Sequence, residues 1–154
     1  YPPQGIRGLG TSMARAAHWN GVEGYLQKAN DEICLIVQAE TKQAIDNLEE
    51  IVAIEGVHGV FIGPSDLSAS MGYVGNPGHP EVVAAVEQGI EIIVKAGKAA
   101  GALAVDEKLA KAYAEKGASF VGVGVDASLL ATSVRNLAIK FCSTNETSNM
   151  TAGY

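Results

Sequence analysis

The sequence has few cysteines, no excess of basic residues and no long hydrophobic run, and each shortage excludes a class of protein. Two cysteines, Cys34 and Cys142, are too few for a disulfide framework, so we expect reduced, packed thiols of an intracellular protein. A formal net charge of −6 leaves no basic stripe for a nucleic acid. No apolar run approaches the roughly 20 residues of a membrane helix, and no signal-peptide pattern is present. We therefore predict a cytoplasmic protein that binds neither nucleic acid nor membrane.

What remains is the composition of one folded domain. The 154 residues are 47% hydrophobic and 18% charged, which is enough for a hydrophobic core and unlike a disordered chain. The chain opens in loop-like residues without an initiator methionine, and we expect a processed product, a natural truncation or a piece of something longer. Residues 143–154 are polar, so we predict a partial domain over residues 1–142 and a disordered tail after it.

From residue 33 onward, short apolar runs typical of strands alternate with segments whose apolar residues have helical spacing. Strands are predicted at 33–40, 59–63, 101–105 and 120–125. Helices are predicted at 41–55, 81–96, 107–116 and 127–141, with a loop rich in Gly, Pro and Ser up to Pro80. Thr41 is a plausible cap for the first helix. Three glycines, Gly56, Gly97 and Gly117, are expected to end helices in the left-handed conformation.

These are four βα units, and we expect parallel strands that are buried on both faces. Two architectures fit the pattern: a flavodoxin-like open sheet or half of a (β/α)₈ barrel. A complete barrel needs about 250 residues, which is more than this chain provides. The alternation of Gly122 and Gly124 in the last strand favours a tightly curved barrel wall.

Two of the predicted strands deliver a carboxylate where they end. Gln38 and Glu40 share one face of the first strand because side chains alternate with a period of two. Asp66 follows the second strand, just after a Gly-Pro turn. Two carboxylates at the mouths of neighbouring strands are suitable ligands for a divalent metal. Simpler alternatives remain open: Glu40 could begin the next helix, where its charge suits the dipole, and Asp66 could be an N-cap.

Other polar residues carry weaker signals. Arg7 lies in a glycine-rich loop and could bind an acidic substrate or simply pack; the loop lacks the strand–helix setting of a dinucleotide fingerprint. The three histidines, His18, His58 and His79, have no ligand spacing, and we expect structural or solvent-facing roles for them. Residues 18–20 are typical of packing at a helix end. Asp126 could cap the last helix or support the site, and we expect it to cap the helix.

Four segments together resemble the HpcH/HpaI aldolase family, the 4-hydroxy-2-oxoheptanedioate aldolases. They are residues 1–8 (YPPQGIRG), 37–41 (VQAET), 59–68 (GVFIGPSDLS) and 123–126 (VGVD). The resemblance runs from residue 1 to about 141, and the loop after the second strand is highly specific to the family. It implies the carboxy-terminal half of a (β/α)₈ TIM barrel of the phosphoenolpyruvate/pyruvate superfamily.

The resemblance also implies a chemistry. Glu40 and Asp66 would be the two protein ligands of Mg²⁺, Mn²⁺ or Co²⁺, while Gln38, Asp66 and the backbone at Ser65 would meet a 2-oxo acid substrate. The reaction would be cleavage of a 4-hydroxy-2-oxo acid to pyruvate and an aldehyde, such as succinate semialdehyde, by Lewis-acid catalysis without a Schiff-base lysine. Relatives assemble as trimers and hexamers in which the last helix packs between subunits, so a homo-oligomer is implied.

The chain departs from the family in one large respect. The histidine base and the enolate-stabilising arginine of the family lie upstream of Tyr1, so no catalytic residue is assigned here. We therefore expect the metal half of the site, inactive or nearly so alone. Two alternatives stay open: a non-catalytic half-barrel that associates through its open strand edges, and a relative of the citryl- or malyl-thioester lyases.

Overall fold

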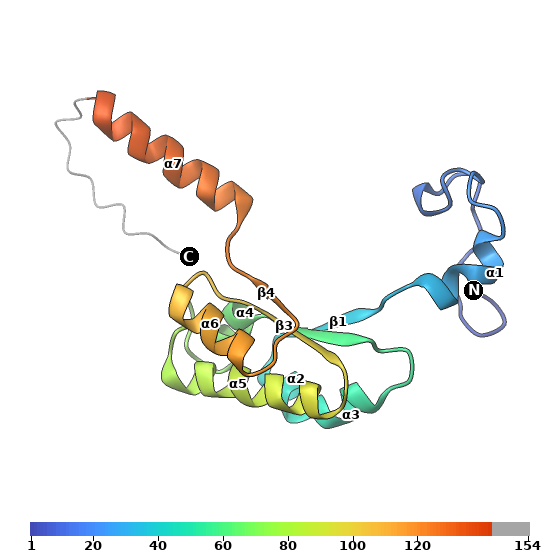
Figure 1. Ribbon diagram of the computed structural model, residues 1–154, viewed down its shortest axis with the longest axis horizontal. Helices are drawn as coiled ribbons and strands as arrows, with labels where there is room; N and C mark the ends of the chain where they lie inside the picture. The colour runs from blue at the N-terminus through green and yellow to red at the C-terminus, as the bar shows by residue number, and fades with distance from the viewer. Residues whose placement is uncertain (143–154) are drawn as a thin grey trace. The chain divides into compact units, whose positions relative to one another are not determined.

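The computed structural model describes residues 1–142, which form two compact units, Tyr1–Cys34 and a larger unit that begins at Leu35 (Figure 1). The predicted tail, residues 143–154, lies outside the described residues. The smaller unit contains a short 3₁₀-helix η1 (Arg15–Ala17) and a helix α1 (Tyr25–Glu32) that the sequence pattern did not predict. Residues 18–20 follow η1, and His18 is its C-cap residue, so the predicted helix end is confirmed. Trp19 is 63% exposed, so the packing expected there is wrong.

The larger unit is built on four parallel strands in the sequential order β1-β2-β3-β4. Their bounds are Ile36–Ala39, Gly59–Ile62, Ala99–Leu103 and Phe120–Gly122. A doubly wound sheet such as that of flavodoxin reverses its strand order at a switch point. A sequential order with right-handed crossovers instead places all helices on one face, which is the arrangement of a barrel wall. The barrel alternative is therefore the correct one.

The helices of this unit follow the strands as predicted, but the bounds of several helices and strands differ in detail. Their bounds are α2 (Lys42–Asp46), α3 (Leu48–Ala53), α4 (Pro64–Ser70), α5 (Pro80–Lys95), α6 (Glu107–Glu115) and α7 (Asp126–Phe141). The predicted helix 41–55 is interrupted at Asn47, where ψ is 12°. Helix α4 occupies part of the predicted loop, because Pro64 is well suited to the first helical position. Strand β3 begins two residues earlier than predicted, since the Ala99 amide donates a hydrogen bond to the His58 carbonyl.

The predicted helix ends are confirmed. The Thr41 hydroxyl accepts a hydrogen bond from the Ala44 amide at 3.0 Å and caps α2. Gly56, Gly97 and Gly117 have φ angles of 87°, 72° and 97°, the left-handed values that glycine adopts without steric cost.

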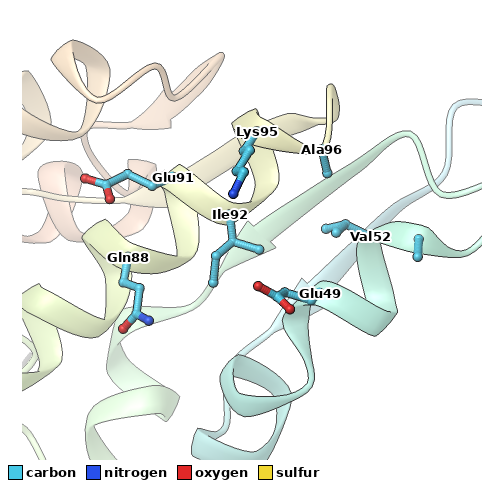
Figure 2. Close-up of a pocket in the computed structure, with 8 residues that line it drawn as sticks. Glu49, Val52, Gln88, Glu91, Ile92, Lys95 and Ala96 are labelled. Atoms are coloured by element: carbon cyan, nitrogen blue, oxygen red, sulfur yellow. The ribbon is translucent and has the colours of Figure 1, made fainter.

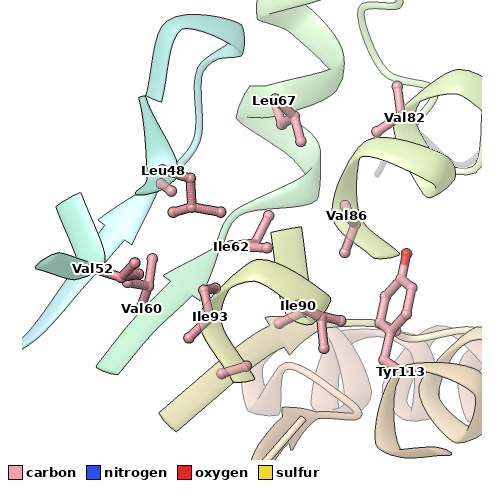
Figure 3. Close-up of a cluster of buried hydrophobic side chains, with 14 of the residues drawn as sticks. Leu48, Val52, Val60, Ile62, Leu67, Val82, Val86, Ile90, Ile93 and Tyr113 are labelled. Atoms are coloured by element: carbon pink, nitrogen blue, oxygen red, sulfur yellow. The ribbon is translucent and has the colours of Figure 1, made fainter. Parts of the chain in front are cut away.

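The core lies between the sheet and the helices of one face (Figure 3). Helices α2, α3, α5 and α6 gather on one side of the strands in Figure 1. Strand β2 contributes Val60 and Ile62, and α5 presents four apolar residues at helical spacing. The fully buried large side chains are Leu48, Val60, Ile62, Leu67, Val82, Val86, Ile90, Ile93 and Tyr113.

The opposite face of the sheet is only partly covered, so the expectation of strands buried on both faces is wrong for β1 and β4. Ile36 is 44% exposed, and no residue of β4 is fully buried. Phe61 and Phe120 stack at 5.8 Å between ring centroids. They meet because the strand between them carries Gly101 at the matching register position, and a Cβ there would lie 2.2 Å from the Phe120 ring.

Both cysteines are free and exposed, which corrects the expectation of packed thiols. Cys34 precedes β1, which begins only at Ile36, and Cys142 follows α7, none of whose side chains is buried. No helix within residues 1–142 is long and apolar enough to span a membrane.

Candidate metal-binding site

Two of the residues predicted to form the site, Gln38 and Glu40, meet where β1 ends. The Gln38 side-chain amide donates a hydrogen bond to Glu40 Oε2 at 2.6 Å, as their shared strand face predicts. Gln38 is exposed and Glu40 is half-buried. The bond fixes one carboxylate oxygen of Glu40 and leaves the other oxygen available to a ligand.

The second strand brings a glycine against this pair. Gly63 follows β2 and lies beside Gln38 and Glu40: a Cβ at Gly63 would sit 3.0 Å from Gln38 Nε2 and 3.3 Å from Glu40 Oε2. Helix α4 begins at the next residue and carries Asp66, exposed, in its first turn. Because β1 and β2 are paired parallel neighbours, Glu40 and Asp66 both follow carboxyl ends at the same sheet edge.

The simpler roles considered for the two carboxylates are both wrong. Helix α2 has Thr41 as its N-cap and no acidic residue in its first turn, so Glu40 precedes the helix rather than beginning it. Helix α4 has Gly63 at its N-cap, so Asp66 lies three residues inside and is not the cap. Neither carboxylate is used up by a capping bond to a backbone amide.

These residues suit a hard divalent cation. Carboxylate oxygens are preferred ligands of Mg²⁺ and Mn²⁺, and Mg²⁺ commonly binds one or two protein carboxylates while water and substrate complete its shell. The space left open by Gly63 lies beside the Glu40 carboxylate, where an added methyl group would intrude. Within residues 1–142 no group of three or more His, Cys, Asp or Glu side chains is placed to hold a metal, and the assignment of Glu40 and Asp66 as ligands stays a prediction.

Ser65 lies in the first turn of α4, next to Asp66. Its carbonyl accepts a hydrogen bond from the buried Ser68 hydroxyl at 2.7 Å, which stiffens this turn. Amide groups in a first helical turn have no acceptor within the helix, so the backbone here can meet an anionic group. The predicted backbone contact at Ser65 stays a prediction.

The other candidates have structural contacts. The Arg7 guanidinium lies 5.6 Å from the centre of the Tyr1 ring, which supports its packing alternative. His58 Nδ1 accepts a hydrogen bond from the Leu35 amide at 3.0 Å, and its structural role is confirmed. Asp126 is the first residue of α7, after the N-cap residue Val125, and its carboxylate accepts a hydrogen bond from the Ala127 amide at 2.7 Å; it binds a first-turn amide as a cap does, but one position later than an N-cap.

His79 is also structural. Its Nδ1 accepts a hydrogen bond from the Glu81 amide at 3.3 Å and caps α5. Its ring stacks on Tyr73 with 3.6 Å between ring centroids. A hydrogen bond to the Glu81 carboxylate raises the pKa of Tyr73, with burial adding to the shift. These contacts hold the loop between α4 and α5.

A groove elsewhere on the molecule has no part in the site. It encloses about 540 Å³ between α3 and α5, with Val52 and Ile92 as its apolar lining and Glu49 and Glu91 at its sides (Figure 2). Glu91 also pairs with Lys116 at 2.6 Å. None of the groove residues follows the carboxyl end of a strand, where barrel enzymes place their chemistry.

Two residues near the site were missed by the sequence reasoning. Gly63 is predicted only as the end of a strand and part of a turn, although its place between an apolar strand and a proline could have suggested close approach. Ser70, at the end of α4, accepts a hydrogen bond from the Lys42 amide at 3.0 Å. No signal in the sequence predicts that contact, because it joins two different βα units.

Comparison with known proteins gives one consistent family. The profile described as HpcH/HpaI aldolase/citrate lyase matches residues 1–133. A 4-hydroxy-2-oxo-heptane-1,7-dioate aldolase of Shigella sonnei is 60% identical over 141 residues, which are 92% of this chain and 54% of that protein. A hydroxypyruvate/pyruvate aldolase of Pseudomonas aeruginosa is 57% identical, over 92% of this chain and 53% of its own length.

The comparison with solved structures points to the same family. An HpcH/HpaI aldolase/citrate lyase family protein from Burkholderia cenocepacia J2315 superposes with a TM-score of 0.79 and 37% identity, covering 90% of this chain and 53% of that one. The present chain therefore spans about half the length of the relatives it matches. Its four parallel βα units correspond to about half of such a barrel, as predicted.

Proposed function

Because this chain belongs to the HpcH/HpaI aldolase/citrate lyase family, we propose that it carries the metal-binding half of a class II pyruvate aldolase. The observation that supports this most is the Gln38–Glu40 hydrogen bond at the end of β1, beside the β2–α4 turn that carries Asp66. The proposed substrate is a 4-hydroxy-2-oxo acid, such as 4-hydroxy-2-oxoheptanedioate, which is cleaved to pyruvate and an aldehyde.

The proposed ligands are Glu40 and Asp66, and the proposed ion is Mg²⁺, Mn²⁺ or Co²⁺. When bound, such an ion supplies Lewis-acid stabilisation of the negative charge that develops on the 2-oxo acid. The chain's own residues prepare the place for it. Gln38 holds one oxygen of Glu40 by hydrogen bonding, and the first turn of α4, which follows the neighbouring strand β2, contains Ser65 and Asp66.

Titration with Mn²⁺ tests the ligand assignment. We expect saturable Mn²⁺ binding to the purified chain and its loss in Glu40→Gln and Asp66→Asn, because each change removes an anionic oxygen donor. Glu49→Gln, in the groove between α3 and α5, is the matched control and should bind as the unchanged chain does. Equal Mn²⁺ affinity in all four proteins would overturn the assignment.

We further propose that the chain alone is inactive or nearly so. The resemblance places the proton-transferring base and the enolate-stabilising arginine upstream of Tyr1, and general acid–base help is worth roughly 10²- to 10⁴-fold. A coupled assay for pyruvate release from a 4-hydroxy-2-oxo acid measures this. Robust steady-state turnover by residues 1–154 would contradict the proposal. Relatives named as aldolases, at 57–60% identity, favour this chemistry over the thioester-lyase alternative.

Association with another chain is proposed as well, most simply as a homo-oligomer. The support is the apolar stripe of α7, which we call the α7 stripe: Leu130, Val134, Leu137 and Phe141, all at least 57% exposed. Their spacing of three and four residues is that of a helix-packing seam.

We place the protein in the cytoplasm, which suits the free thiols of Cys34 and Cys142.

A further inference from the structure

Two hydrogen bonds join the segment that carries Glu40 to the segment that carries Asp66. The Gly63 amide donates to the Ala39 carbonyl at 3.1 Å, and the Lys42 amide donates to Ser70 Oγ at 3.0 Å. The first bond is made by Ala39, just before Glu40, and the second by Lys42, two residues after Glu40. Together they fasten the β1–α2 turn to both ends of α4.

Gly63 matters for space rather than for backbone freedom. Its φ of −96° is one that any residue adopts. A Cβ at this position, however, would lie 3.0 Å from Gln38 Nε2, 3.2 Å from Glu40 Cβ and 3.3 Å from Glu40 Oε2. All three distances are shorter than the 3.5–4.0 Å of a favourable contact between heavy atoms. An alanine would therefore push the amide and the carboxylate away from the β2–α4 turn.

Ser70 supplies an acceptor that α2 lacks. Lys42 is the first residue of α2, so its amide is one of the four without an acceptor inside the helix. The cap residue Thr41 is already engaged by the Ala44 amide. The Ser70 hydroxyl, on the last residue of α4, takes the Lys42 amide instead and so ties the start of α2 to the end of α4.

We propose that Gly63 and Ser70 are positioning residues of the metal site, which set the place of the Glu40 carboxylate relative to the helix that carries Asp66. This inference rests on the proposed metal-binding function and adds two residues to it. Neither residue contacts the ion in this proposal. Each acts through Glu40. Gly63 leaves room for the hydrogen-bonded Gln38 and Glu40 side chains, and Ser70 holds the β1–α2 turn that follows Glu40.

The test is an Mn²⁺ titration of single variants by calorimetry, checked by the electron paramagnetic resonance signal of free Mn²⁺. We expect Gly63→Ala and Ser70→Ala to bind Mn²⁺ about 10- to 100-fold more weakly, the usual effect of losing a group that orients a metal ligand. Ser70→Asp keeps an oxygen acceptor for the Lys42 amide and should restore the affinity. Circular dichroism and metal-free thermal unfolding report whether each variant stays folded.

Matched controls separate positioning from general damage. Gly78→Ala adds a Cβ with no atom closer than 3.9 Å, and Ser133→Ala removes an exposed hydroxyl on α7. Both should bind Mn²⁺ like the unchanged chain. Unaltered affinity in Gly63→Ala and Ser70→Ala, or no rescue by Ser70→Asp, would overturn the positioning role while leaving the ligands intact. No Mn²⁺ binding by the unchanged chain would overturn the proposed function and this inference together.

Discussion

Tyr113 is a large side chain with a polar hydroxyl that is buried in the core. It projects from α6 toward α5 and is 1% exposed. Burial raises the pKa of Tyr113 to about 12, and the nearby Glu87 carboxylate adds to the shift. The unfolded chain would release this proton near the ordinary value of about 10. A buried tyrosine of this kind makes the stability of the fold depend on pH.

The sign of that dependence follows from the raised pKa. Below about pH 10 both states keep the proton, so the stabilisation is fully present; it is lost between about pH 10 and 12, where only the unfolded state releases the proton. We expect the unchanged chain to lose about 1 kcal/mol more unfolding free energy than Tyr113→Phe between pH 9 and 11. Urea unfolding at the two pH values measures this difference. Equal losses in both proteins would contradict it.

Residues of the site divide into those that local pattern predicts and those that it does not. Gln38 and Glu40 were predicted on one face because strand side chains alternate, and they are hydrogen-bonded to each other. Gly63 and Ser70 were not predicted, since their contacts join units that are distant in sequence. Periodicity describes one element at a time, whereas the support around a site comes from neighbouring elements.

Among the elements, α6 shows how much one cap contributes. Asp106 precedes the helix, and its carboxylate accepts a hydrogen bond from the Leu109 amide at 2.9 Å. We expect Asp106→Ala to cost about 1 kcal/mol of unfolding free energy, while Asp106→Asn, which keeps the acceptor, should cost much less. Lys108→Ala, exposed in the same first turn, is the control. Equal stability of the Ala and Asn variants in urea unfolding would show that the cap bond contributes nothing.

The order of the elements was predictable, and their bounds were less so. All four predicted strands and the helices after them are present, because buried parallel strands and amphipathic helices leave distinct patterns. Helix α4 was hidden by its Gly-Pro-Ser composition, although Leu67 is fully buried. The break at Asn47 and the early start of β3 depend on packing and on a hydrogen bond to His58. Tertiary contacts of this kind decide where elements end.

At the scale of the whole molecule, the sequential order of the strands decides between the two architectures that the sequence left open. It leaves one sheet face partly uncovered, with the stacked Phe61 and Phe120 on it, and two edge strands. The relatives are about twice as long as the part this chain covers. The rest of such a barrel could not be predicted from this sequence, because the chain spans only about half the length of those relatives.

The proposed association has a direct test at this scale. We expect sedimentation velocity to give a species larger than the 15.9 kDa chain, because the α7 stripe exposes large apolar side chains. The double substitution Leu130→Lys and Leu137→Lys should shift the distribution toward the single chain. Thr132→Lys with Asn136→Lys adds the same charge elsewhere on α7 and should leave it unchanged. A well-folded single chain at all concentrations would contradict the proposal.

The pairing of β1 with β2 has a consequence for the order of folding. Glu40 and Asp66 belong to consecutive βα units, so the contacts that bring them together span a short stretch of chain. Ile36 pairs with Gly59, whereas Gly59 pairs with Ala99, so the loop closed between β1 and β2 is shorter than the loop closed between β2 and β3. Because closing a shorter loop loses less chain entropy, we expect the strand pair that carries both proposed ligands to form before β3 joins it.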